Sequence, residues 1–131
     1  MSRSDVELDI KETFGLVPAW MAEVPDAVLE SEWTTMKTFQ LSETVIPNKF
    51  KELIGLAVSG ATRCRYCVYF HREAARLFGA TEEEINEAAF MAKHTMGWST
   101  YLNAHQYDFD EFKEEFDQIA AHVRAQMEAA V

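Results

Sequence analysis

Several kinds of residue are scarce in this sequence, and each scarcity excludes a class of protein. The 131 residues include three prolines and five glycines beside 48% hydrophobic residues, which excludes collagen-like and disordered chains. Twelve basic residues against twenty-two acidic ones give a net charge of −10, so we expect binding to neither nucleic acid nor anionic lipid. No apolar run approaches the roughly 20 residues of a membrane-spanning helix. This length predicts a single domain over residues 1–131.

Cysteine is also scarce, with two residues in the whole chain, Cys64 and Cys67. The first residues alternate in charge and lack the apolar stretch of a signal peptide, so we expect a cytoplasmic protein. In a reducing compartment a cysteine pair is more often catalytic or metal-binding than structural. Two cysteines three residues apart also close too small a loop to restrain the unfolded chain much. The pair is therefore the first candidate for chemistry.

Helical spacing of apolar residues recurs along the chain, whereas strand-like alternation does not persist. We predict an all-α bundle of about six to seven helices. Start and stop signals place helices at 5–14, near Pro18, from Pro25, at 48–62, at 64–78, from Thr81 and from Phe109.

One segment is ambiguous, because Leu53–Ser59 alone also fits a buried strand leading into a CxxC pair, as in a thioredoxin-like fold. Around it, helical spacing links Phe50, Leu53, Ile54, Ala57, Val58 and Ala61, with Lys49, Lys51 and Glu52 around the other side. This spacing favours the helix.

The stretch CRYCVYFHREAARLFG, Cys64–Gly79, contains both cysteines and one of the four histidines. At about 100° per residue, Cys67 and His71 share the apolar face with Cys64, while the arginines point elsewhere. Cys67 lies one helical turn from both Cys64 and His71. A helix start can depress the pKa of a thiol, and a histidine one turn away can take its proton.

An acidic side chain would fix the tautomer of this histidine and stabilise its cation. Glu52 is the candidate, because it lies on the preceding helix near Gly55 and Ser59, whose small side chains would let another helix approach. Glu73 is the rival, but it projects about 160° away from His71 on the same helix.

Two other interpretations of the cysteine pair stay open. Buried cysteines often behave as small hydrophobic residues without chemistry. A zinc site is the more specific of the two alternatives, with Cys64, Cys67 and His71 as three ligands and His94 or His105 as the fourth. Haem attachment is excluded, because Val68 and not histidine follows Cys67. The leading expectation includes neither a metal nor a cofactor.

With these residues placed, the sequence resembles the alkylhydroperoxidase AhpD-like group of the carboxymuconolactone decarboxylase family. The similar core, Ile46–Ala88, has a glutamate twelve residues before the first cysteine, CxxC, a histidine four residues after the second, two alanines, a glycine and an acidic helix start. The resemblance implies that Cys67 attacks peroxide to give a sulfenic acid, that Cys64 resolves it as a disulfide, and that His71 and Glu52 relay the proton. An external dithiol or reductase protein would then reduce the disulfide.

The resemblance also implies a homo-oligomer, a trimer or hexamer. The sequence differs from the peroxidase prototype at one position of the motif. Tyr66 stands where the peroxidase prototype of the group has a second histidine. The decarboxylase branch generally lacks the cysteine pair, which disfavours lactone decarboxylation. We therefore expect a thiol-dependent peroxidase or disulfide oxidoreductase acting on a hydroperoxide or disulfide substrate, with a zinc-binding or non-catalytic oligomeric binding protein as the alternative.

Overall fold

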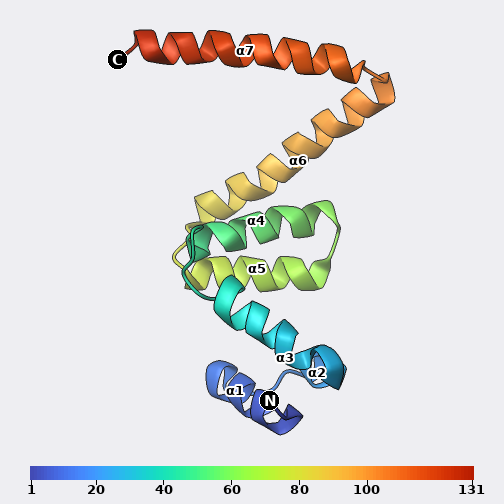
Figure 1. The fold of residues 1–131 in the computed structure, drawn as a ribbon, viewed down its shortest axis with the longest axis vertical. Coiled ribbons are helices and arrows are strands. Elements are labelled where there is room, and N and C mark those ends of the chain that lie inside the picture. The colour runs from blue at the N-terminus through green and yellow to red at the C-terminus, as the bar shows by residue number, and fades with distance from the viewer. The chain divides into compact units, whose positions relative to one another are not determined.

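The computed structural model describes all residues from 1 to 131, and every regular element in it is a helix. The predicted all-α class is confirmed, and no helix is long and apolar enough to cross a membrane. In chain order the elements are α1 (Arg3–Phe14), α2 (Ala19–Ala22), α3 (Asp26–Thr35), one π-helical turn η1 (Met36–Gln40), α4 (Asn48–Ala61), α5 (Arg65–Leu77), α6 (Glu82–His105) and α7 (Phe109–Ala129), as Figure 1 shows.

Contacts between residues divide the chain into two compact units, Met1–Phe90 and Met91–Val131. The first unit contains α1 to α5 and the beginning of α6, and the second contains the rest of α6 together with α7. That residues 1–131 act as a single domain therefore stays a prediction.

The helices α1, α2 and α3 enclose the first of two apolar clusters. Its buried residues are Val6, Ile10, Met21, Leu29 and Trp33. Burial of each such large side chain contributes roughly 1.5–3 kcal/mol. The helix α1 starts two residues earlier than predicted, because Ser2 and Asp5 cap it reciprocally, and it ends as predicted at the left-handed Gly15.

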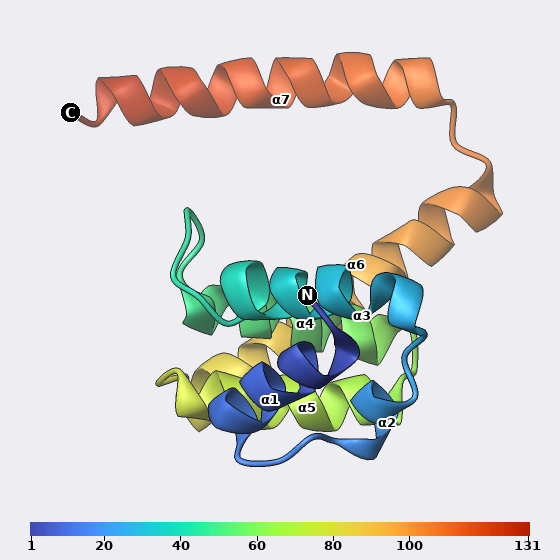
Figure 2. The same ribbon diagram turned by 60° about the horizontal axis from the view of Figure 1, so that its bottom comes forward.

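The helices α4 and α5 lie side by side and antiparallel, as Figure 1 and Figure 2 show. Their bounds agree with the predicted ranges 48–62 and 64–78 to within one residue, so the strand alternative for Leu53–Ser59 is wrong. Between them and the start of α6 lies the second apolar cluster, formed by Leu56, Ala75 and Ile85. This pair of helices forms the frame of the site.

The face of α4 that is buried differs from the one its apolar residues indicated. Phe50, Ile54 and Val58, expected to point inward, are each about half exposed. The buried positions of this helix are instead Asn48, Glu52, Leu56 and Ser59. The helix therefore turns a largely polar face to α5, which brings a carboxylate into the interior.

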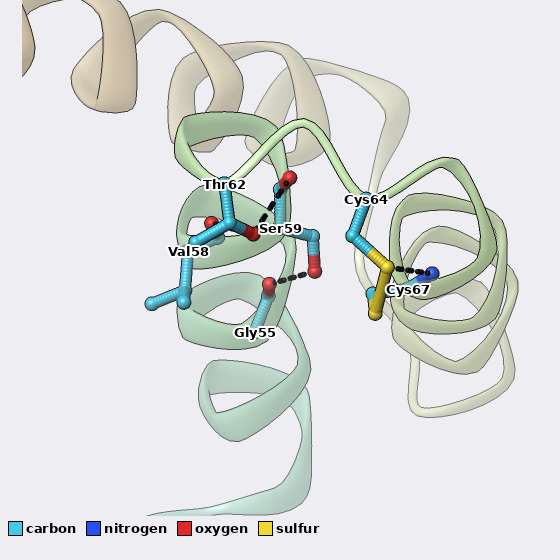
Figure 3. The surroundings of a disulfide bond; sticks show 6 residues. All are labelled: Gly55, Val58, Ser59, Thr62, Cys64 and Cys67. Carbon is cyan, nitrogen blue, oxygen red and sulfur yellow. Dashed lines mark hydrogen bonds between the residues drawn. A yellow bond between two sulfur atoms is a disulfide. The ribbon is translucent and has the colours of Figure 1, made fainter.

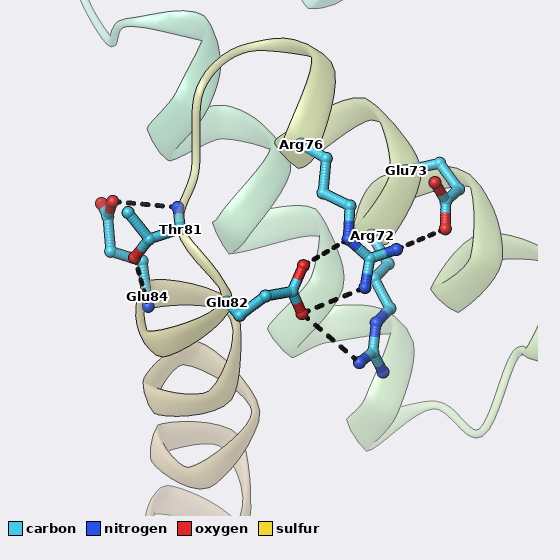
Figure 4. A network of polar contacts seen from close by, with 6 residues as sticks. All are labelled: Arg72, Glu73, Arg76, Thr81, Glu82 and Glu84. Atoms are coloured by element: carbon cyan, nitrogen blue, oxygen red, sulfur yellow. Dashed lines mark hydrogen bonds and ion pairs between the residues drawn. The ribbon is translucent and has the colours of Figure 1, made fainter.

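A network of charged side chains fixes the turn from α5 to α6 (Figure 4). Arg76 donates hydrogen bonds to both Glu73 and Glu82, and the bond to Glu82 lowers the pKa of that carboxyl below its usual range. Thr81 and Glu84 cap the start of α6 reciprocally, in agreement with the predicted helix start at Thr81. Glu84 also pairs with Lys49 of α4 at 3.0 Å. These contacts join α4, α5 and α6 at the end of α5 that lies away from the cysteines.

Candidate dithiol site

The two cysteines lie at the beginning of α5, where Cys64 is the residue that caps the helix. Its sulfur accepts a hydrogen bond from the backbone N–H of Cys67 at 3.2 Å, and a disulfide joins the two residues (Figure 3). The backbone N–H of Cys64 donates to the carbonyl of Ser59 at 3.0 Å, which ties the loop to the end of α4. A thiolate formed here by reduction would be stabilised by the amides and dipole of the helix N-terminus.

One turn further along α5, His71 meets a carboxylate from α4. Its Nδ1 lies 2.6 Å from Oε2 of Glu52, whose side chain is 0% exposed. With the proton on Nδ1 donated to the carboxylate, Nε2 is the nitrogen that can accept a proton. The pair spans the two antiparallel helices, so His71 is oriented by a residue nineteen positions earlier in the chain.

Gly55 makes this contact between the helices possible. A Cβ atom at this position would fall 2.5 Å from both Cε1 and Nδ1 of His71, so the imidazole occupies the space where a side chain would lie. The neighbouring Ser59 donates its hydroxyl hydrogen bond to the carbonyl of Gly55, which satisfies that buried polar group within α4. The histidine therefore needs both a carboxylate and a glycine on the opposite helix.

Two buried side-chain oxygens of α4 have no hydrogen-bond partner, Oε1 of Glu52 and Oδ1 of Asn48. Asn48 lies one turn before Glu52 and donates its side-chain amide to the carbonyl of Leu41. An unpaired carboxylate oxygen in the interior is costly, so this arrangement is unusual for a residue that serves packing alone. The burial of Asn48 was not predicted from the sequence. The only pattern that could have indicated it is that Asn48 lies four residues before Glu52, on the same face of the helix.

A cavity of about 640 Å³ opens onto Cys67 and His71. Its walls are mainly aromatic and aliphatic, and they come from α1, α2, η1, α5 and the residues that directly follow η1 and α5. The apolar residues are Phe14, Trp20, Met36, Leu41, Tyr66, Tyr69, Phe70, Leu77 and Phe78. The volume lies within the range typical of small-molecule sites. Tyr66, the residue that departs from the peroxidase prototype, belongs to this wall. No sequence pattern indicated that Phe14 and Trp20 would contribute to this cavity.

The other residues considered from the sequence lie elsewhere. Glu73 bonds to Arg76 rather than to His71 (Figure 4). His94 and His105 contact the rings of Trp98 and Tyr101 within the second unit. No group of three or more histidine, cysteine, aspartate or glutamate side chains is placed to hold a metal ion. The structure thus brings together Cys64, Cys67, His71 and Glu52, whose catalytic roles stay predictions.

Comparison with known proteins gives three findings. The sequence profile of the carboxymuconolactone decarboxylase family matches residues 22–107. A Paracoccus denitrificans protein described as uncharacterized protein 4 in cox locus is 28% identical over 80 residues, covering 61% of this chain and 72% of that protein. The crystal structure of the alkylhydroperoxidase AhpD core from Rhodospirillum rubrum is similar with a TM-score of 0.71 and 29% identity, and the match covers 82% of each chain.

Proposed function

This chain belongs to the carboxymuconolactone decarboxylase family as an AhpD-like member, and we propose that it is a thiol-dependent peroxidase or disulfide oxidoreductase. The observation that carries the proposal is that His71, one helical turn after the cysteine pair, contacts the buried carboxylate of Glu52. The cysteine pair favours redox chemistry over the decarboxylation for which the family is named. Because the cycle needs a supply of thiol reductant, we propose that the protein acts in the cytoplasm.

The proposed cycle begins with the reduced dithiol. Nε2 of His71 takes the proton of the Cys67 thiol, and the carboxylate of Glu52 stabilises the imidazolium that results. The Cys67 thiolate attacks the terminal oxygen of a hydroperoxide, the O–O bond breaks, an alcohol leaves with the proton, and a sulfenic acid remains on Cys67. The Cys64 thiol then loses its proton and attacks the Cys67 sulfur, and the S–O bond breaks as the disulfide forms. The hydroxyl group leaves with that proton as water. Two electrons and two protons from an external thiol reductant restore the dithiol.

The walls of the cavity indicate the kind of substrate. An organic hydroperoxide or a small organic disulfide would bury its apolar part against the aromatic side chains while its reactive atoms face Cys67. Hydrogen peroxide has no apolar part that these walls could bury, so they would not increase its affinity. We therefore propose an organic substrate.

Glu52→Gln tests the proposed relay. The amide cannot balance the charge of the imidazolium, so we expect the pH profile of Cys67 alkylation to move to higher pH and peroxide turnover to fall by about 10² or more. Iodoacetamide rates measured from pH 5 to 9, in a Cys64→Ser background that leaves Cys67 as the single thiol, give the profile.

Glu73→Gln is the matched control, because Glu73 is the rival carboxylate and bonds to Arg76. We expect it to leave the alkylation profile where it is. Identical profiles for Glu52→Gln and the parent protein would refute the relay and leave only a cysteine pair.

We also propose that the protein acts as a homo-oligomer, a trimer or hexamer. Six apolar residues of α7, spaced by three or four positions, are exposed: Phe109, Phe112, Phe116, Ile119, Val123 and Met127. Spacing of this kind is typical of helices that pack against other helices. Together with the exposed Phe50, Ile54 and Val58 of α4, this is more apolar surface than a monomer normally leaves in water.

Phe116→Glu is expected to weaken this assembly, because it places a charge in the middle of the apolar stripe of α7. Sedimentation equilibrium should give the parent protein a mass that is a multiple of the 15.0 kDa chain, and the variant a smaller mass. Glu114→Gln, a control elsewhere on the same helix, should leave the mass unchanged. A parent protein of 15.0 kDa at micromolar concentration would contradict the oligomer.

A further inference from the structure

Two arginines flank Cys64 in an otherwise acidic chain. Between Glu52 and Glu73 the sequence has three arginines and no acidic residue, although the net charge of the chain is −10. Of these arginines, Arg72 lies 4.0 Å from Glu82, whereas Arg63 and Arg65 are exposed and form no ion pair. Both residues next to Cys64 in the chain are therefore arginines whose guanidinium groups are exposed and form no ion pair.

The backbone at Arg63 is held in an uncommon conformation. Its φ of 57° lies in the left-handed region, which costs a residue with a side chain more than it costs glycine. Hydrogen bonds from the N–H of Arg63 to Gly60 and from the N–H of Cys64 to Ser59 fix this turn. On the other side of Cys64, the guanidinium of Arg65 lies 5.3 Å from the ring of Tyr66. The backbone of Arg63 is thus fixed by hydrogen bonds, and the guanidinium of Arg65 has an aromatic contact.

We propose that Arg63 and Arg65 form a recognition site for the reductant of the Cys64–Cys67 disulfide, and that this reductant is a small thiol carrying one or more carboxylates. The inference rests on the redox function proposed above. Guanidinium groups bind carboxylates through paired hydrogen bonds, which gives direction as well as attraction. Two arginines match one or two carboxylates, whereas a specific protein partner would need about 800 Å² of surface on each side.

The site also determines which sulfur is attacked. A carboxylate bound beside Cys64 places the thiolate of the reductant at Sγ of Cys64, the disulfide bond breaks, and Cys67 leaves as a thiolate near His71. A second thiol attacks the sulfur of the bound reductant in the mixed disulfide, which releases the oxidised reductant and the Cys64 thiolate. In total, two thiols become one disulfide, and two electrons and two protons pass to the cysteine pair.

Three small thiols that differ in charge test the proposal on the oxidised full-length protein. We expect 3-mercaptopropionate to reduce the disulfide fastest per thiolate, then neutral 2-mercaptoethanol, then cationic cysteamine, with about a tenfold range at low ionic strength. The difference between the fastest and the slowest rate should become smaller in about 0.5 M salt, because the salt screens charges that are more than a few ångströms apart. Rapid acid quench and mass spectrometry measure the rates.

In a double variant, Arg63→Asn with Arg65→Gln, the reduction rates of the three thiols should agree to within about twofold, while the rate with 2-mercaptoethanol stays the same. Asparagine is chosen because it tolerates the left-handed backbone better than most residues. Arg72→Gln is the matched control, since Arg72 already faces Glu82, and it should keep the full range.

The outcomes separate this inference from the proposed function. Equal rates for the three thiols in the parent protein, or an unchanged range in the double variant, would overturn the arginine site even if turnover of an organic hydroperoxide with neutral dithiothreitol is normal. A charge-dependent range that the double variant loses supports the site even if no hydroperoxide is turned over, and that result would overturn the peroxidase function alone.

Discussion

Cys67→Ser is expected to abolish peroxide turnover and to leave no sulfenic acid that can be trapped, because the hydroxyl that replaces the thiol cannot be oxidised by peroxide. Cys64→Ser is expected to behave differently. It retains Cys67 beside His71 and Glu52, so one equivalent of peroxide should produce a sulfenic acid that no second thiol resolves. The pair of variants therefore distinguishes the attacking thiol from the resolving thiol.

Mass spectrometry after treatment with peroxide and a dimedone probe measures this difference. The Cys64→Ser protein should gain one adduct, on Cys67, while Cys67→Ser gains none. Far-UV circular dichroism controls for folding. The opposite pattern, with an adduct on Cys64, would assign the attack to the cysteine that caps the helix, and equal turnover in Cys67→Ser and the parent protein would exclude the dithiol mechanism.

Gly55→Ala is expected to produce the second large effect without changing any residue proposed to react. The added methyl group would lie 2.5 Å from two ring atoms of His71, so the imidazole or the two helices must move apart. Overpacking of this kind costs roughly 1–3 kcal/mol of stability. A displacement of the base by about 1 Å can lower turnover by about 10². Peroxide turnover and thermal unfolding measured on the same sample report the two effects.

Gly60→Ala is the matched control for this substitution, because Gly60 lies on the same helix and a Cβ there meets nothing within 4 Å. Alanine is favoured over glycine in a helix by up to about 1 kcal/mol, so this variant should be as stable as the parent or more so, with full activity. If Gly55→Ala retained both the activity and the alkylation profile of the parent protein, the close packing of His71 against α4 would not matter for the chemistry.

The order of the helices could be predicted because their signals are local. The start of α4 follows from Pro47, the end of α5 from Gly79, and the start of α6 from the capping pair Thr81 and Glu84. The prediction was less accurate where two local signals compete. At the N-terminus the capping pair of Ser2 and Asp5 moves the helix start to Arg3, and the wider turn η1 follows α3 without a distinct pattern in the sequence.

The buried face of α4 could not be predicted from its apolar residues. Phe50, Ile54 and Val58 form the more hydrophobic stripe, but they are exposed, while Glu52 has no exposed surface. Hydrophobic periodicity ranks the faces of a helix by their transfer energy from water. In an oligomer two faces of one helix can be covered, one by its own chain and one by a neighbour, so that ranking alone does not select the intramolecular contact.

The sequence by itself determined that Cys64, Cys67 and His71 share one face of one helix, because the helical repeat fixes the positions of residues three and four apart. Only the tertiary structure decided that Glu52 and Gly55 meet His71 across two antiparallel helices, that Asn48 on the same helix is buried, and that α1 and α2 contribute Phe14 and Trp20 to the cavity. These contacts join residues far apart in the chain. They depend on which helix faces pack together, and no local pattern specifies that choice.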